Sequence, residues 1–187
     1  HAELNIDVTT DDYAAGLYFL EASSGKSGII HWGDSSDGVE GGLQFLTGGT
    51  SAANNTRMVI DSAGNVGYGA TPHAFQAGRV GMAIGGNGVI ESTTAAGAGG
   101  FLKIAQNHYY GGSAENTISN DEATSYVQTA GTHKFYTAPA HASVATWTTA
   151  LTIANSGNVG IGTTPDELLH LKSSTSAKPV LKIENTN

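Results

Sequence analysis

The stretch Leu151-Thr-Ile-Ala-Asn-Ser-Gly-Asn-Val-Gly-Ile-Gly-Thr-Thr-Pro165 decides the fold, because an earlier copy of it exists in the same chain. Met58-Val-Ile-Asp-Ser-Ala-Gly-Asn-Val-Gly-Tyr-Gly-Ala-Thr-Pro72 is identical to it at eight of fifteen positions, at an offset of 93 residues. Repetition of this kind is typical of proteins that stack copies of one structural unit. We predict one β-repeat unit at residues 1–78, a second at 79–165, and a linker with the start of a third repeat at 166–187.

Short strands are predicted in both units, because β-rich runs alternate with clusters of Gly, Ser, Asn and Asp. The expected strands lie at Leu4–Val8, Leu17–Leu20, Gly28–Trp32, Leu43–Thr47, Thr56–Ile60, Phe101–Ile104, Ser125–Gln128, His133–Thr137 and Ala150–Ile153. We expect one helical turn, at Asp166–Leu171, just after Pro165. The predicted fold class is therefore all-β with minimal helix: repetitive short-strand hairpins that form an intertwined homotrimeric fibre, with β-prism-like, β-helix-like or small β-sandwich units.

The repeated motif predicts a hairpin with a five-residue loop, Asp61–Asn65, in which Gly64 adopts a positive φ. After the loop, Val66 and Tyr68 occupy one face of a strand, and the glycines between and after them occupy the other face. Glycine weakens a strand unless another backbone approaches closely there. We interpret that approach as contact between three chains at an axis; a β-bulge or a bound ligand is the alternative. The glycines assigned to these structural roles are Gly64, Gly67, Gly69, Gly157, Gly160 and Gly162.

The composition also favours an oligomer. Hydrophobic residues make up 39% of the chain, but many of them are Ala and Val, and Gly accounts for 26 of 187 residues. Burial contributes only about 25 cal/mol per Å² of apolar surface, so such a chain gains little stability alone. Partner chains would supply the missing buried surface.

Charge and cysteine content exclude several classes of function. The net charge of −8 disfavours nucleic acid, which requires basic surfaces, and disfavours anionic membranes. The chain contains no cysteine, so it has neither disulfides nor thiolate metal sites. We expect no nucleic-acid partner and no membrane insertion. The first residue is His1 and no closing motif precedes Asn187, so we expect the chain to be a fragment.

Leu151–Leu171 resembles the repeat of bacteriophage tail fibres and tailspikes, in which Gly-Asn-Val-Gly-Ile-Gly-Thr-x-Pro is followed by Leu-His-Leu. The first copy departs from that pattern at Tyr68 and at Phe75-Gln76. In those fibres the repeat often precedes a self-cleaving chaperone domain of the endosialidase type. The resemblance implies a homotrimeric, β-rich shaft or receptor-binding region on a virion, extracellular after release. The chaperone's Ser–Lys pair is not found here, so self-cleavage is not assigned.

Candidate sites for catalysis or metal binding do not stand out. Asp11, Asp12, Asp34, Asp37 and Glu40 form an acidic group that could cut glycosides or bind Ca²⁺, but exposed turn carboxylates explain it better. The seven histidines show no metal-binding spacing. In a trimer, one histidine from each chain could still combine to form a three-histidine metal site, and His31 and His133 are the first candidates. We predict no catalytic residues, no metal and no cofactor.

Aromatic residues beside Gly and polar groups give a weak indication of carbohydrate binding. The glycan contacts we consider are Trp32, His108, Tyr109 and Tyr110. The simpler interpretation is that these rings and Trp147 fill a core that lacks large aliphatic side chains.

The sequence thus predicts a structural, non-enzymatic segment of a viral tail fibre or tailspike that contributes to host attachment. Its expected partners are two further copies of itself, other tail or fibre proteins, and host cell-surface glycans. The alternatives are a glycan-binding receptor-recognition module, a polysaccharide depolymerase and a bacterial trimeric adhesin.

Overall fold

The computed structural model describes residues 15–21, 24–32, 42–47, 56–97, 99–173 and 181. This part of the chain contains strands and turns but no helix, which confirms the predicted all-β class. Side chains are described from Gly42 onward, with the same gaps.

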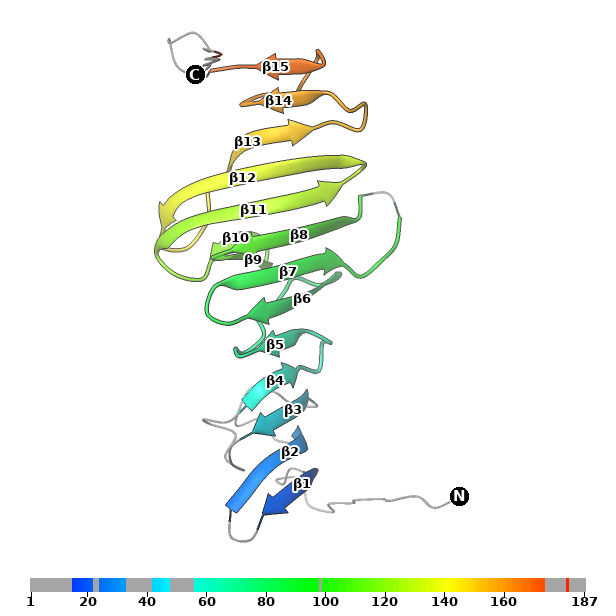
Figure 1. The fold of residues 1–187 in the computed structure, drawn as a ribbon, viewed down its shortest axis with the longest axis vertical. Helices are drawn as coiled ribbons and strands as arrows, with labels where there is room; N and C mark the ends of the chain where they lie inside the picture. The colour runs from blue at the N-terminus through cyan, green and yellow to red at the C-terminus, as the bar shows by residue number, and fades with distance from the viewer. Residues whose placement is uncertain are drawn as a thin grey trace, which may run out of the picture.

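Thirteen strands form one sheet, in which neighbours along the chain are also neighbours in space apart from one hairpin that leaves it (Figure 1). The strands run across the long axis of the sheet. Since neighbouring strands lie about 4.8 Å apart, the sheet is about 60 Å long. The strands of this sheet are β1 (Ala15–Glu21), β2 (Ser24–Trp32), β3 (Gly42–Thr47), β4 (Thr56–Ile60), β5 (Val66–Tyr68), β6 (Arg79–Ile84), β7 (Gly88–Thr93), β8 (Phe101–Gln106), β11 (Asp121–Thr129), β12 (Thr132–His141), β13 (Thr148–Ile153), β14 (Val159–Ile161) and β15 (Leu169–Leu171).

The sequence repeat is also a structural repeat. β4 and β5 form an antiparallel hairpin, and β5 then pairs in parallel with β6. β13 and β14 form the corresponding hairpin, and β14 pairs in parallel with β15. Backbone hydrogen bonding therefore continues across both predicted unit boundaries.

The hairpin loop has the predicted geometry. Gly64 has φ +83° and Gly157 has φ +88°, the left-handed region that glycine tolerates best. The Asp61 backbone N–H donates to the Asn65 carbonyl (2.9 Å), and the Asp61 side chain accepts the Asn65 N–H (2.8 Å). These bonds close the loop at Asp61–Asn65.

Two of the glycines after the loop, Gly67 and Gly160, face a segment of their own chain, which corrects our interpretation of these two positions. A Cβ on Gly67 would lie 2.0 Å from the Ala70 carbonyl oxygen and 2.9 Å from Pro72 Cδ. A Cβ on Gly160 would lie 2.4 Å from the Thr163 carbonyl oxygen and 2.9 Å from Pro165 Cδ. The connection to the next, parallel strand folds back over the strand that it leaves. Glycine is required because the chain's own backbone occupies that space.

The other predicted glycines act differently. A Cβ on Gly64, Gly69 or Gly157 would meet no atom within 4 Å, but all three have positive φ, so they serve turns. Gly162 combines φ +70° with close approach to the Lys172 carbonyl oxygen.

Every strand that we predicted within the described residues is present, and Leu4–Val8 lies outside them. The predicted helical turn at Asp166–Leu171 is wrong: its last three residues form β15, because the parallel pairing with β14 holds them extended. Strands β6, β7, β9, β10 and β15 were not predicted. Gly81 interrupts the hydrophobic pattern of β6, Glu91 interrupts that of β7, and the other three strands are too short for a pattern.

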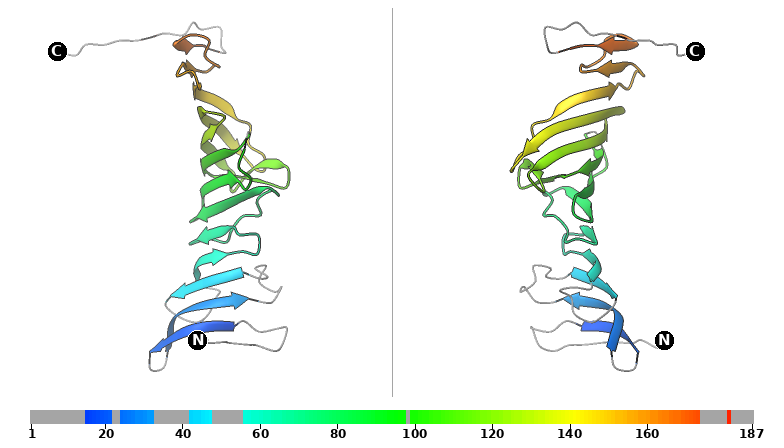
Figure 2. Two further views of the ribbon diagram at one scale, coloured as in Figure 1. Left: turned by 90° about the vertical axis from the view of Figure 1, so that its right-hand side faces the viewer. Right: turned by 60° about the vertical axis from the view of Figure 1, so that its left-hand side comes forward.

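Asn107 directs the chain out of the sheet after β8. It is fully buried with φ +56°, a conformation that Asn tolerates better than most residues. Its side-chain N–H groups donate to the carbonyls of Ser119, Asp121 and Glu122, each at 3.1 Å. The segment between Asn107 and Ser119 forms the hairpin of β9 (His108–Gly111) and β10 (Ala114–Thr117), which lies on one side of the sheet (Figure 2).

Candidate functional site

One face of the sheet carries an unbroken row of directly paired residues that are all hydrophobic. The register joins one residue from each of the strands β3 to β8 and β11 to β15, always at directly opposite positions. This apolar row consists of Leu43, Ile60, Val66, Met82, Ile90, Ile104, Tyr126, Phe135, Leu151, Ile161 and Leu171.

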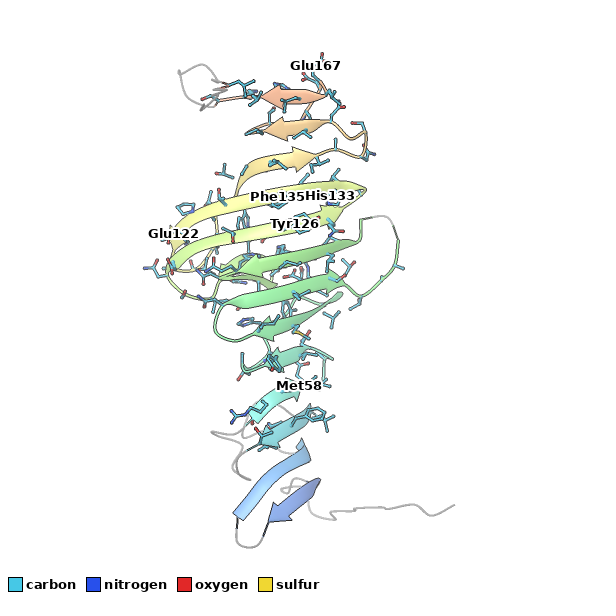
Figure 3. The ribbon with its side chains drawn as sticks, in the orientation of Figure 1. Met58, Glu122, Tyr126, His133, Phe135 and Glu167 are labelled. Carbon is cyan, nitrogen blue, oxygen red and sulfur yellow. The ribbon has the colours of Figure 1, made fainter. Side chains whose placement is uncertain are left out.

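Large side chains on this face remain exposed. Ile104 is 49% exposed, Phe135 is 44% exposed, and Tyr68, two residues beyond the row on β5, is 61% exposed. The apolar row contains no Asp, Glu, Lys or Arg. Figure 3 shows Tyr126 and Phe135 with His133 on β11 and β12. We call this side of the sheet the apolar face.

A row that includes three charged residues lies on the opposite side, which we call the covered face. Gly81, Glu91, Lys103, Val127 and Lys134 follow one another there by direct pairing. The β9–β10 hairpin and the loop of residues 69–78 pack over part of this face, and they contact each other where the Gln76 N–H donates to the Tyr110 carbonyl (3.1 Å). The two faces therefore differ in both charge and covering.

Glu115 on β10 is the centre of a polar network on the covered face. Its Oε2 accepts hydrogen bonds from Lys103 Nζ at 3.2 Å and from Trp147 Nε1 at 3.1 Å, and His108 Nε2 lies 2.5 Å away. His108 is completely buried, and its ring packs edge-on against Trp147 at 4.8 Å between centroids. The network connects the hairpin to the sheet.

These contacts keep Glu115 ionised. Burial raises the pKa of its carboxyl group, but the hydrogen bond from His108 and the positive charge of Lys103 outweigh burial and lower the pKa to about 2. A stable carboxylate therefore lies beside a buried lysine.

A second ion pair lies next to this network. Arg79 pairs with the fully buried Glu91, whose Oε2 also accepts the Tyr110 backbone N–H at 3.1 Å. The Arg79 guanidinium stacks over the ring of Tyr110, 3.8 Å from its centroid, and lies 4.6 Å from the centroid of Phe101. Cation–π contacts of this kind stabilise a desolvated guanidinium.

The two ion pairs border a pocket of about 280 Å³ on the covered face. Three aromatic rings line it together with charged and hydroxyl side chains. The lining residues are Arg79, Phe101, Lys103, Glu115, Ser125, Val127, Thr129, Tyr136 and Trp147. Such a mixture of rings and convergent polar groups is the usual composition of a small-molecule site.

Of the four residues considered for glycan binding, the three whose side chains are described do not form one site. His108 has no exposed surface, so it cannot contact a ligand in this conformation. Tyr109 stacks on His73 at 4.4 Å between centroids, and Tyr110 stacks on Arg79. The side chain of Trp32 lies outside the described side chains. The structure instead places Trp147 and Tyr136 at a pocket.

Sequence reasoning assigned Trp147 to the core and did not single out Tyr136. Trp147 does pack on the small core of Ala123, Ala138 and Ala145. The pairing of β8, β11 and β12 brings Tyr136 beside Lys103. Trp147 reaches Glu115 because the segment before it is hydrogen-bonded to β10, through Thr117 N–H to the Ser143 carbonyl and Ala145 N–H to the Glu115 carbonyl. Lys103 and Glu115 are separated by 12 positions in the sequence, a spacing that matches no motif and could not have shown this.

The described residues include no group of three His, Asp or Glu side chains positioned to hold a metal ion. The acidic group from Asp11 to Glu40 and the side chain of His31 lie outside the residues whose side chains are described. His133 lies on the apolar face, where Tyr126 Oη is 2.5 Å from its Nδ1. In the ranges that the structure covers, no helix is long and apolar enough to cross a membrane.

Neither the protein-family models nor the curated proteins show a match to this chain.

Proposed function

We propose that this chain is a structural segment of a homotrimeric viral fibre of the bacteriophage tail-fibre or tailspike class, in which three copies pack their apolar faces together. The observation that carries the proposal is the apolar row, which runs along the sheet from β3 to β15 without a charged residue. The role is to extend and stiffen the fibre, and so to support host attachment with other fibre proteins.

A single sheet cannot bury this face alone. Stable domains place the hydrophobic face of a sheet against a second layer, and on the described part of the chain the second layer covers only the opposite face. The buried hydrophobic residues there are mostly alanines, among them Ala83, Ala105 and Ala123. Burying one large side chain contributes about 1.5–3 kcal/mol. Packing the whole apolar row against other copies would therefore add the stability that the isolated chain lacks.

The shape of the row supports self-association along the fibre axis. The row runs along the long axis of the sheet, perpendicular to its strands (Figure 1). Three such sheets around a common axis form a triangular prism with the loops and the β9–β10 hairpin outside. The number three comes from the resemblance of Leu151–Leu171 to trimeric fibre repeats.

Sedimentation equilibrium tests the proposal directly. Three copies of the 19.1 kDa chain give about 57 kDa. A monomer at micromolar concentration would contradict any packing of the apolar faces. A dimer would contradict the three-fold arrangement but would still agree with packing of the apolar faces against each other.

A further inference from the structure

We infer that the pocket beside Glu115 binds one ring of a neutral saccharide. All lining residues belong to one chain and lie on or above the covered face. In the proposed trimer the apolar faces point inward, so the pocket opens outward. The inference adds a ligand to the proposed fibre and rests on that function only for this outward display, since the pocket exists without a second copy.

The size and the rings of the pocket match a sugar ring. Its volume of about 280 Å³ lies just below the range of roughly 300–1,000 Å³ that small-molecule sites usually have. A single ring fits this space better than an extended chain, whose other units would lie outside. Phe101, Tyr136 and Trp147 offer flat apolar surfaces to the C–H groups of such a ring.

Several polar groups in the lining have unused hydrogen-bonding capacity. Within the described part of the chain, the hydroxyl groups of Ser125 and Tyr136 make no hydrogen bond, although Ser125 is only 7% exposed. Lys103 donates to Glu115 alone, and all contacts of that carboxylate involve Oε2. A ligand rich in hydroxyl groups, each a donor and an acceptor, would satisfy these groups together.

The charge of the pocket excludes an ionised ligand. Lys103 is balanced by Glu115, and Arg79 is balanced by Glu91. An added anion or cation would lose its water without gaining an unpaired counter-charge, which is unfavourable. The net charge of −8 on the chain also repels anions at long range. A neutral ligand avoids both penalties.

The main stacking ring is held in place before a ligand arrives. Trp147 donates from Nε1 to Glu115, packs edge-on against His108, and contacts the alanine core. Tyr136 meets it edge-on, with 6.1 Å between ring centroids. A ring that is already ordered loses less conformational entropy on binding.

The test is a fluorescence titration of a Trp32→Phe variant, in which Trp147 is the one remaining tryptophan. The probes are glucose, galactose, mannose and N-acetylglucosamine, their oligosaccharides on a printed array, and the charged sugars glucuronate and glucosamine. We expect saturable quenching or a spectral shift with at least one neutral sugar and none with the charged pair. No response to any neutral probe, or an equal response to a charged one, would overturn the inference.

Two small variants separate binding from folding. Ser125→Ala and Tyr136→Phe each remove a hydroxyl group without a partner, so the melting temperature should stay equal or rise. Each should weaken the saccharide affinity about five- to tenfold, the effect of one lost hydrogen bond. Ser62→Ala, in the exposed β4–β5 turn, is the matched control and should bind like the parent. Unchanged affinity in both pocket variants would contradict the proposed contacts.

A third variant tests the role of charge. Glu115→Gln leaves Lys103 without its counter-charge, so this variant should bind glucuronate better than the parent does. The result is independent of the fibre proposal. If the protein is a monomer that binds neutral sugars, the trimer proposal is wrong and the saccharide site is supported. If it is a trimer that binds no sugar, the fibre proposal is supported and the saccharide site is wrong.

Discussion

Tyr126 and Phe135 lie directly opposite each other on β11 and β12, with their rings stacked at 4.8 Å between centroids (Figure 3). Both belong to the apolar row. Cross-strand aromatic pairs stabilise a sheet, yet here Phe135 keeps 44% of its surface exposed. The pair is therefore a preformed, partly exposed contact surface on the apolar face, and it is a suitable place to test association.

Phe135→Glu should dissociate the proposed trimer. It would bring three carboxylates into an interface that excludes water, and an unpaired buried charge costs several kcal/mol. We expect sedimentation velocity at micromolar concentration to show monomers. The control is Lys134→Glu, which introduces the same side chain at the neighbouring position on the covered face and should leave the trimer intact. Dissociation by both variants would point to general unfolding.

Gly67→Ala should destabilise the protein by about 2–4 kcal/mol, because the new Cβ would overlap the Ala70 carbonyl oxygen. Urea denaturation at one fixed protein concentration measures this change. Gly86→Ala is the control: its Cβ would meet no atom within 4 Å and its φ is not positive, so we expect a change within about 0.5 kcal/mol. Equal effects at both positions would refute the account of the folded-back connection.

Asn107→Ala should lower the free energy of unfolding by about 2–4 kcal/mol, since it removes buried hydrogen bonds and places alanine at a positive φ. Asn107→Gly loses the same hydrogen bonds, but glycine adopts the positive φ at this position without strain. This variant should therefore be about 1 kcal/mol more stable than Asn107→Ala. If the two variants unfold at the same denaturant concentration, the backbone conformation is not strained.

Stability should depend on pH through Glu115. The folded pKa of about 2 lies below the ordinary value of 4.5, so the unfolded chain binds the proton more tightly. The contribution of this carboxylate is complete above pH 4.5 and is lost as the pH falls toward 2. Because the Glu115 side chain is one-third exposed, we expect its contribution to the free energy of unfolding to be about 1–2 kcal/mol. Urea unfolding of the wild type and Glu115→Gln should show a stability difference that shrinks over this interval. A constant difference would disprove the linkage.

The repeat carried most of the information about local structure. Apolar residues in alternation, the Gly-Asn turn and the spacing of 93 residues predicted hairpins at Thr56–Tyr68 and Leu151–Ile161, because strand alternation and positive-φ turns depend on near neighbours. The close approach at Gly67 and Gly160 was also predicted. Its partner was assigned to another chain, since a sequence pattern reports that space is needed without reporting what fills it.

The amino-acid sequence alone was enough to predict the all-β class, the repeat and the positions of the turns, since those depend on contacts within a few residues. Tertiary structure decided which face is apolar along its whole length and which rings meet Glu115. Both depend on strand register, and a shift of one residue would exchange the faces of a strand. Register is set by the packing of many strands together, so only the folded sheet separates the row with Glu91, Lys103 and Lys134 from the apolar row.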